Sequence, residues 1–429
     1  MIAQVTRLVA ACLVLSVACA STRAQDAPEA APANPAATPP AATEADEPSV
    51  IAARVGGDKS QTRIVFDLSS KIDVRAFALA DPYRLVIDLP QVRFQLPPQA
   101  GDTGKGLVKA FRFGLMKKGG SRIVLDLTAP VRLDKSFVLD PADGQPARLV
   151  LDLTAIDRPA FLREVAFDNR PRTDLGPAAK PANDGAGATN DSRPVIVLDP
   201  GHGGIDEGAH AATGEAEKNV ALDFALMLRD KLAQSGKYRV EMTRSDDTFI
   251  ALTDRVQFAR AHRAQLFISL HCDALARGEG DAQGATVYTL SDHASDAEAA
   301  RLAEAENRAD IIAGVDLSSE PNEIADILID LAQRETRSFT THFARALVGD
   351  LKNAIRLHKQ PLRSAGFRVL KAPDVPSVLI ELGFVSNRAD FKELMSETWR
   401  TRAADSITHA VNDYFSRRMA GGAGAVGRE

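Results

Sequence analysis

Four copies of one six-residue pattern, Arg, aliphatic, Val, apolar, Asp, Leu, constrain the first half of this chain most strongly. The copies occupy residues 63–68, 84–89, 122–127 and 148–153, and they form two pairs about 60 residues apart. Their β-branched residues and intervening turns are typical of short strands. The repeat therefore predicts a duplicated all-β sandwich. We expect the Arg and Asp of each copy to form cross-strand ion pairs on an exposed face, although a ligand-binding role stays open.

Segments rich in Pro, Ala, Gly and Asp flank this repeat region and divide the chain. They hold too few large apolar residues to offset the entropy lost on ordering. We expect a disordered spacer at residues 25–48, a β domain at 49–156 and a linker at 157–192. A second domain should follow at 193–418, with a flexible tail at 419–429.

The first residues resemble an export signal. Arg7 precedes an apolar stretch from Leu8 to Ala20, and small residues ending at Ala24 offer a cleavage point. The apolar stretch is shorter than the roughly 20 residues that a membrane-spanning helix needs. We therefore predict a signal peptide at 1–24 and a mature chain without a stable membrane anchor, with lipid modification of Cys19 as the alternative.

Cysteine and charge counts narrow the class of protein further. Of the three cysteines, Cys12 and Cys19 lie in the predicted signal, so the mature chain has no disulfide within it. Cys272 follows His271, but neighbours on a strand point to opposite faces, so we interpret Cys272 as buried filler rather than a nucleophile. A net charge of -5 argues against nucleic acid as a partner.

Beyond residue 193 the sequence alternates between strand and helix patterns. Strands are predicted at 195–199, 239–243, 266–270, 285–290 and 378–382. A helix that begins near Glu217 presents an apolar stripe formed by Val220, Phe224, Leu228 and Leu232. Further helices are predicted at 253–263 and 398–417. The alternation indicates an α/β domain with a mostly parallel sheet flanked by helices.

Four side chains occupy positions that packing alone does not explain. His202 follows the first strand in a glycine-rich turn, Glu217 opens the next helix, and His271 and Glu381 lie at the ends of two later strands. The carboxyl ends of parallel strands meet at one edge of a sheet, so we expect the set to converge. Singly, a solvated histidine or a glutamate at a helix start is ordinary. Only the buried carboxylate of Glu381 favours a function by itself.

Two imidazoles and a carboxylate are suitable ligands for zinc, which leaves one position open in catalytic sites. Zinc lowers the pKa of a water molecule to about 7 and polarises a carbonyl group. Glu381 fits the role of proton carrier, because burial raises the pKa of a carboxyl group. A phosphate-binding loop is a weak alternative, since the turn at residues 199–204 lacks both the usual glycine spacing and a Lys-Ser/Thr pair.

The segments around these residues resemble the signatures of zinc-dependent N-acetylmuramoyl-L-alanine amidases of the Amidase_3 type. The matching segments are Val-Leu-Asp-Pro-Gly-His-Gly-Gly at 197–204, Glu-Lys at 217–218, Ser-Leu-His-Cys-Asp at 269–273 and Ile-Glu-Leu-Gly-Phe-Val-Ser-Asn at 380–387. The repeat region is similar to the AMIN domain that precedes this catalytic domain in periplasmic cell-division amidases.

The resemblance implies hydrolysis of the amide between N-acetylmuramic acid and the L-alanine of the peptidoglycan stem peptide. By the same resemblance, His202, Glu217 and His271 would bind Zn²⁺, and Glu381 would be the catalytic acid and base. Cys272 departs from the alanine usual after the family's histidine, which leaves the ligand in place. The resemblance also implies a periplasmic location, enrichment at the division septum and peptidoglycan as the AMIN ligand.

A long insert at about 294–336 separates a predicted strand from a later helix. It contains two acidic residues in a helical run, Glu304 and Glu306, and then a capped apolar helix with Ile324, Leu328 and Leu331 on one face. In similar division amidases such an insert covers the zinc until a LytM-type activator of the division machinery displaces it. We expect Glu306 to occupy the open zinc position, with Glu304 as the second candidate.

Two other functions stay open at this point. A non-catalytic peptidoglycan-binding scaffold would keep the AMIN-like region but lack one of the four site residues. A zinc peptidase or deacetylase of another exported class would share the metal chemistry and act on a different amide. The muropeptide products separate these, because only amidase action yields free stem peptides and bare glycan.

Overall fold

The computed structural model describes residues 47–97, 99–116, 119–142, 144–168, 191–274, 283–315 and 327–425. The predicted signal peptide, the spacer up to residue 46, most of the linker and Ile324 of the insert lie outside these residues. Within the chain, Glu47–Glu429 form one compact unit. No helix among the described residues combines the length and the apolar character needed to cross a membrane.

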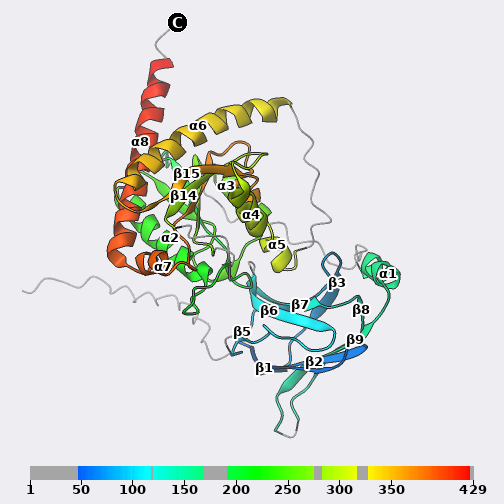
Figure 1. Ribbon diagram of the computed structural model, residues 1–429. Coiled ribbons are helices and arrows are strands. Elements are labelled where there is room, and N and C mark those ends of the chain that lie inside the picture. Colours follow the sequence, from blue (N-terminus) through cyan, green and yellow to red (C-terminus); the bar gives the residue numbers. More distant parts are fainter. Residues whose placement is uncertain are drawn as a thin grey trace, which may run out of the picture. The chain divides into compact units, whose positions relative to one another are not determined.

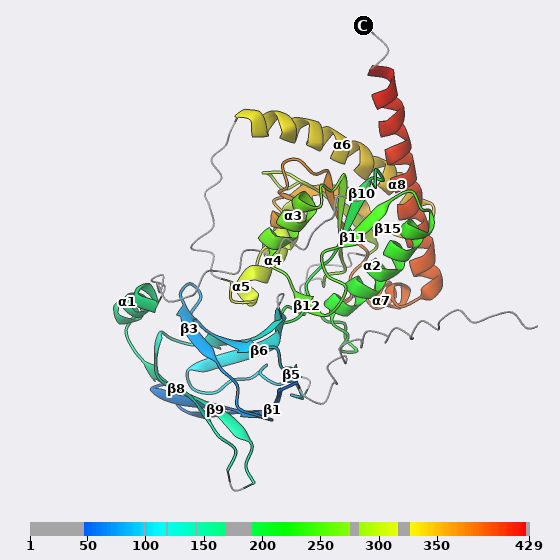
Figure 2. The same ribbon diagram turned by 180° about the vertical axis from the view of Figure 1, so that it is seen from behind.

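A β sandwich forms the first domain, as predicted (Figure 2). Its strands are β1 (Ser49–Gly57), β2 (Gln61–Leu68), β3 (Arg75–Leu79), β4 (Arg84–Pro90), β5 (Arg93–Phe94), β6 (Val108–Met116), β7 (Gly120–Leu127), β8 (Val131–Leu139) and β9 (Ala147–Ala155). One sheet has the order β5-β1-β2-β9-β8 and the other β12-β6-β7-β4-β3. β12 (Thr248–Phe249) comes from the second domain and pairs with β6 in parallel.

The four motif copies lie in β2, β4, β7 and β9, so each half of the duplicated sequence contributes two of the motif strands. β2 pairs with β9 and β4 pairs with β7, both antiparallel, which places one motif pair at the centre of each sheet. Alternate residues such as Ile64, Phe66, Ile87 and Leu125 are completely buried between the two sheets. The Arg, Val and Asp positions of each motif therefore share the opposite face.

Two motif arginines, Arg63 and Arg122, form cross-strand ion pairs of the kind predicted. The prediction of an exposed face is wrong for the second sheet, because Val86 and Val124 on that face are completely buried. Arg63 Nε lies 2.6 Å from Asp152 Oδ1 in the first sheet, and Arg122 Nε lies 2.7 Å from Asp88 Oδ1 in the second. These pairs join positions that are directly opposite in the strand register.

Helix α1 (Arg158–Asp168) corrects the prediction that the linker begins at residue 157. Asp157 caps its first turn, because the Asp157 side chain accepts the backbone N–H of Ala160 at 2.7 Å. Phe161 is completely buried and stacks edge-on against Tyr83 of the β domain. One aromatic anchor and one cap are sufficient to order this turn-rich sequence.

A six-stranded sheet with the order β11-β10-β13-β16-β14-β15 forms the centre of the second domain. Its strands are β10 (Val195–Pro200), β11 (Arg239–Met242), β13 (Leu266–His271), β14 (Ala285–Leu290), β15 (Leu357–Ala365) and β16 (Ser377–Glu381). All neighbouring pairs are parallel except β14 with β16. The predicted mostly parallel sheet is confirmed, and its apolar central strands are buried on both faces.

Helices cover both faces of this sheet (Figure 1). They are α2 (Glu217–Gln234), α3 (Leu252–Ala261), α4 (Ala297–Glu306), α5 (Ala309–Ile312), α6 (Ile327–Lys352), α7 (Arg388–Leu394) and α8 (Glu397–Ala425), with a short 3₁₀ turn η2 (Arg368–Leu370). α2, α6 and α8 pack on one face, where the predicted stripe of α2 is buried in the core. α3 and α4 pack on the other face.

Two elements of the second domain also differ from the sequence prediction. β15 is an edge strand with alternating polar residues and Pro361, a composition that does not resemble a central strand. α8 continues to Ala425, whereas we predicted that it would end near Arg417 and be followed by a flexible tail. Alanine favours helix, so the Gly-Ala segment can continue the hydrogen-bonding pattern of the long helix before it.

Candidate metal centre

The carboxyl edge of the sheet gathers the side chains that the sequence singled out. β10, β13 and β16 are adjacent and parallel, and His271 and Glu381 are the last residues of β13 and β16 and lie opposite each other in register. His202 follows the end of β10, and Glu217 is the first residue of α2. Parallel topology thus brings together residues that are far apart in sequence.

The turn after β10 depends on residues with unusual backbone conformations. His202 has a φ of 59°, which is in the left-handed region that few side chains adopt. A Cβ at Gly201 would lie 2.4 Å from His271 Cε1, so only glycine allows the His271 ring to approach the turn. A strained backbone at a candidate ligand is consistent with a functional constraint.

A buried aspartate and two buried arginines hold this turn in place. Asp199 is completely buried and accepts hydrogen bonds from Thr243 Oγ1 at 2.6 Å, Ser269 Oγ at 2.7 Å and Arg255 Nη1 at 2.9 Å. Arg255 also donates to the carbonyl oxygen of His202 at 2.7 Å. The buried ion pair therefore supports the backbone that carries His202.

A second buried arginine, Arg244, continues this support. Its guanidinium group donates to the carbonyl oxygens of Pro200 at 3.1 Å, Gly201 at 2.7 Å and Lys218 at 2.8 Å. Burial lowers the pKa of Arg244 to about 10. Arg244 therefore connects the turn after β10 to the first turn of α2, which carries Glu217.

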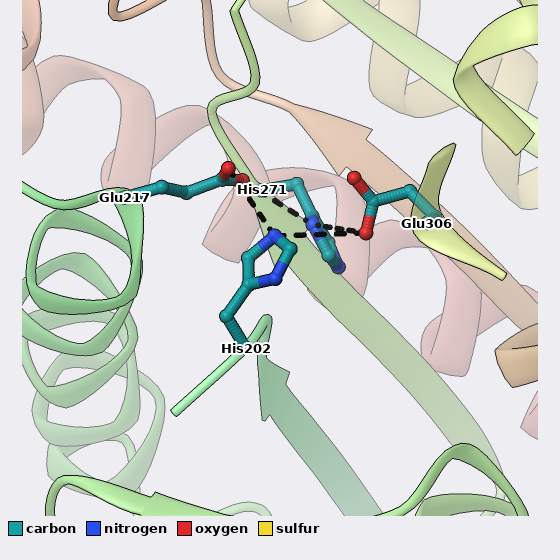
Figure 3. Close-up of side chains that lie close together, drawn as sticks. All are labelled: His202, Glu217, His271 and Glu306. Atoms are coloured by element: carbon teal, nitrogen blue, oxygen red, sulfur yellow. Dashed lines mark ion pairs between the residues drawn. The ribbon is translucent and has the colours of Figure 1, made fainter. Parts of the chain in front are cut away.

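The side chains of His202, Glu217 and His271 converge on one point (Figure 3). His202 Nε2 lies 3.2 Å from Glu217 Oε2, and His271 Nδ1 lies 3.3 Å from Glu217 Oε1. Each residue offers one ligand atom, and together with an oxygen of Glu306 these atoms all lie within 4.8 Å of one another. His202 Nε2 and His271 Nδ1 are buried and have no hydrogen-bond partner. The donor set and its size fit a metal ion.

Neighbouring groups fix the orientation of these ligands. His202 Nδ1 lies 2.9 Å from Asp206 Oδ2, so the ring donates from Nδ1 and leaves Nε2 free to accept. The N–H groups of Ala209 and Cys272 donate to the two oxygens of Glu217 at 2.9 and 2.8 Å. Burial by itself would lower the pKa of His202, but the charges of Glu217, Asp206 and Glu306 raise it well above its usual value.

Glu306 enters the same site from the end of α4 (Figure 3). Its Oε2 lies 3.1 Å from His271 Nδ1 and 3.6 Å from His202 Nε2, and its side chain is 8% exposed. Glu304, the second predicted candidate, is 66% exposed and pairs with Arg308 instead. The structure thus brings Glu306, and not Glu304, to the position expected for a fourth ligand.

Glu381 lies beside this cluster and is completely buried. Its Oε2 accepts the N–H of Asp273 at 3.1 Å, while its Oε1 has no hydrogen-bond partner. Burial and the negative charges of Glu217, Asp273 and Glu306 raise the pKa of Glu381 well above its usual value.

The neighbouring thiol of Cys272 is also completely buried, as predicted. Burial raises the pKa of this thiol well above its usual value, which keeps it protonated and a poor nucleophile. Cys272 packs in the apolar core between the sheet and α2, α6 and α8.

Sequence reasoning missed the residues that support the ligands. Asp199 belongs to the quoted motif, and a carboxylate at the end of an apolar strand was a usable signal. Asp206, Arg244 and Arg255 lie in loops or helices, and nothing in their local spacing distinguishes them from surface charges.

Comparison with known proteins decides the family. The family model described as N-acetylmuramoyl-L-alanine amidase matches residues 196–413, and the AMIN domain model matches residues 52–153. The chain belongs to the N-acetylmuramoyl-L-alanine amidase family. This amidase therefore hydrolyses the amide between N-acetylmuramic acid and L-alanine in peptidoglycan, and its β sandwich is an AMIN domain.

Two of the relatives match this amidase over most of its length, and a third matches a shorter part of it. N-acetylmuramoyl-L-alanine amidase AmiC of Escherichia coli is 34% identical over 378 residues, which cover 86% of this chain and 89% of the relative. AmiC of Neisseria meningitidis is 34% identical over 383 residues, covering 86% and 90%. AmiA of Escherichia coli is 37% identical over 264 residues, covering 61% of this chain and 89% of the relative.

Proposed function

We propose that this amidase is a zinc enzyme in which His202, Glu217 and His271 hold the metal and Glu381 is the catalytic acid and base. One observation carries the proposal: His202 Nε2 and His271 Nδ1 are buried without hydrogen-bond partners, and both face the carboxylate of Glu217. Unpartnered buried polar atoms are costly, and a cation would satisfy both nitrogens. Two imidazoles and one carboxylate with an open position are typical of catalytic zinc.

The chain's own residues would prepare the site for hydrolysis. When bound, zinc supplies a Lewis acid that polarises the amide carbonyl and lowers the pKa of water. Asp206 keeps the free nitrogen of His202 directed into the site, and the backbone amides on Glu217 fix both carboxylate oxygens.

Glu381 would move the proton that amide hydrolysis requires. The N–H of Asp273 holds Oε2, and the unpartnered Oε1 is available to take a proton from water and deliver it to the leaving nitrogen of L-alanine. Its raised pKa supports this role, because a carboxyl group of ordinary pKa would not keep a proton near neutral pH.

Removal of the metal is expected to abolish activity. Dialysis against a strong zinc chelator should stop release of dye-labelled peptidoglycan fragments, and added Zn²⁺ should restore it, because the proposed mechanism has no other electrophile. Added Mg²⁺ serves as the control and should not restore activity, since it prefers oxygen ligands in an octahedral shell. Full activity in protein shown by elemental analysis to be metal-free would exclude the proposed role.

We further propose that the enzyme is inhibited by its own insert. Glu306 lies where substrate carbonyl and water would have to approach the metal, and its carboxylate already contacts both histidines. A carboxylate is a good zinc ligand, so Glu306 would compete directly with substrate. The open state requires displacement of α4 and α5.

Glu306→Gln is expected to raise basal activity about tenfold or more. A charged hydrogen bond contributes about 1.5–3 kcal/mol, and glutamine keeps the shape of the side chain while removing the charge. The matched control is Glu304→Gln, two residues away on the exposed side of α4. Initial rates on dye-labelled peptidoglycan measure the effect, and equal rates for both variants and the wild type would contradict inhibition by Glu306.

Export, division and activation complete the proposal. The apolar stretch before Ala24 supports export to the periplasm, and the AMIN domain supports recruitment to peptidoglycan at the septum. A LytM-type protein of the division machinery is the expected activator, because the insert has to be displaced. N-terminal sequencing of the periplasmic protein tests cleavage after Ala24, and a mature chain that starts at Cys19 would favour lipid modification.

The two alternative functions, a non-catalytic scaffold and a zinc enzyme for another amide, are supported to different degrees. A non-catalytic scaffold is inconsistent with membership of the amidase family and with the presence of His202, Glu217, His271 and Glu381 in the sequence. Preference among amide bonds is tested by mass spectrometry of muropeptide products. Free stem peptides together with bare glycan are expected, whereas cleavage inside the stem peptide would support a peptidase.

A further inference from the structure

Three arginines of the AMIN domain contact the C-terminal end of α5, which follows Glu306 closely in the chain. Arg84 Nη1 donates to the carbonyl oxygen of Ile311 at 2.5 Å, Arg112 Nη1 to Ile312 at 3.1 Å, and Arg122 Nη1 to Ala313 at 3.1 Å and Gly314 at 3.0 Å. Carbonyl groups at the end of a helix lack partners inside the helix. The three guanidinium groups therefore cap α5 from another domain.

Apolar residues between the three arginines also contact the segment that follows α5. Gly314 has a φ of 66°, and a Cβ at this position would lie 2.8 Å from Val86 Cγ2 and 3.0 Å from Val124 Cγ2. Both valines are completely buried and belong to the same apolar cluster as Ala309 and Ala313. The hydrogen bonds of the three arginines are partly buried beside these apolar side chains, and partial burial makes a hydrogen bond stronger than on an open surface.

The duplicated sheet provides an internal comparison for this surface. Arg54 and Arg63 on β1 and β2 of the first sheet correspond to Arg112 and Arg122 on β6 and β7, with the same opposite residues in the strand register. Each of these four arginines pairs with an aspartate of its own sheet.

Equivalent residues of the two sheets of the AMIN domain have different neighbours. Arg148, which corresponds to Arg84, has a buried Nε without a hydrogen-bond partner. A Cβ at Gly114 of β6 would lie 2.2 Å from Ile205 N, whereas nothing described lies within 4 Å of one at the equivalent Gly56. Among the described residues, the hydrogen bonds to the end of α5 come from arginines of the second sheet.

The segment between Glu306 and the capped carbonyls is short and fixed along its length. Asn307 donates to Gly366 O at 2.9 Å and accepts the N–H of Arg368 at 2.8 Å. Asp310 is completely buried and accepts the N–H of Leu252 at 2.9 Å. Withdrawal of Glu306 from the metal site has to break contacts of this segment.

We propose that Arg84, Arg112 and Arg122 form a docking surface, the arginine face, that holds the inhibitory segment and so keeps Glu306 in the metal site. The AMIN domain is then a latch on the catalytic domain in addition to a recruitment module. A ligand with carbonyl or carboxylate groups that binds the arginine face competes with α5 and favours the open enzyme. This inference rests on the proposed inhibition by Glu306.

The first test replaces two arginines of the arginine face and, as a control, the two equivalent arginines of the other sheet. Arg112→Ala/Arg122→Ala in the full chain is expected to raise basal activity about fivefold, because three hydrogen bonds to the carbonyl groups of residues 312–314 are lost. The matched control, Arg54→Ala/Arg63→Ala, loses two equivalent arginines and two equivalent ion pairs of the other sheet and should stay at the wild-type rate. A short soluble muramoyl-peptide substrate keeps wall binding out of the comparison.

The second test acts from the insert and does not alter the AMIN domain. Gly314→Ala adds a methyl group against Val86 and Val124 and should also raise basal activity. Its control is Gly236→Ala, since Gly236 has a φ of 65° and nothing within 4 Å of its Cβ position. Hydrogen exchange at residues 312–315, whose amides bond within this segment, should be faster in both latch variants and unchanged in both controls.

Glu306→Gln, measured in parallel, separates the latch from the inhibition itself. If Glu306→Gln is activated while both latch variants keep wild-type rates and wild-type exchange, the latch is wrong and inhibition stands. If Glu306→Gln is not activated, both proposals fail. Activation of Glu306→Gln and of both latch variants, with silent controls, supports the latch.

Discussion

Replacing Glu381 with glutamine is expected to lower kcat by about 10²- to 10⁴-fold while the protein keeps its metal. Glutamine has the same shape, and its carbonyl oxygen can still accept the N–H of Asp273. It cannot take up or release a proton, however, and Glu381 is not among the side chains that converge on the metal position. Turnover is measured by dye release from labelled peptidoglycan, and metal content by elemental analysis.

Glu393→Gln on the exposed side of α7 is the matched control and should retain wild-type turnover. Both variants are best measured in a Glu306→Gln background, so that inhibition does not mask the loss. A metal-loaded Glu381→Gln protein with undiminished turnover would remove Glu381 from the mechanism.

Asp199→Ala is expected to lower the free energy of unfolding of the catalytic domain by about 3–5 kcal/mol. Asp199 is completely buried, and its loss leaves the charge of Arg255, also buried, without its carboxylate partner. It also removes the acceptor for Thr243 and Ser269. Because Arg255 holds the carbonyl oxygen of His202, metal affinity should fall together with stability.

Thermal unfolding followed by circular dichroism measures this loss. The control is Asp374→Ala, which breaks an ion pair with Arg260 in which both side chains are about half exposed, and such pairs contribute little. Equal unfolding midpoints for the two variants would contradict the structural role given to Asp199.

Periodic patterns in the sequence were sufficient for most of the fold. The repeated motif predicted the β sandwich because its alternation places Ile64 and Phe66 inward and Arg63 outward, a purely local property. The apolar runs that became β10 and β13 are buried on both faces, and they predicted a parallel sheet for the same reason.

Elements that form only because of contacts with distant parts of the chain could not be predicted from local sequence patterns. β15 is polar and contains Pro361, so only its place at the sheet edge makes it a strand. α1 depends on the contact of Phe161 with Tyr83, which the local sequence does not reveal. The antiparallel pairing of β14 with β16 likewise depends on how the chain connects its strands, and the local sequence does not indicate it.

The residues of the candidate site also divide into those that local sequence predicts and those that only the folded chain brings into place. His202, Glu217, His271 and Glu381 were predicted because each conflicts with its local pattern or matches a motif. Asp206, Arg244 and Arg255 support the ligands only through the folded chain. The arginine face was missed for a different reason: the motif predicts ion pairs within each sheet, and it does not indicate which sheet contacts α5.

Elemental analysis of the purified full-length amidase, with His271→Ala and Glu306→Gln prepared in parallel, tests the metal site most directly. We predict about one zinc ion per chain in the wild type and in Glu306→Gln, and loss of zinc in His271→Ala. A wild-type protein without zinc would contradict this site. So would a Glu306→Gln protein that loses zinc as completely as His271→Ala, because Glu306 would then be a structural ligand and not a displaceable one.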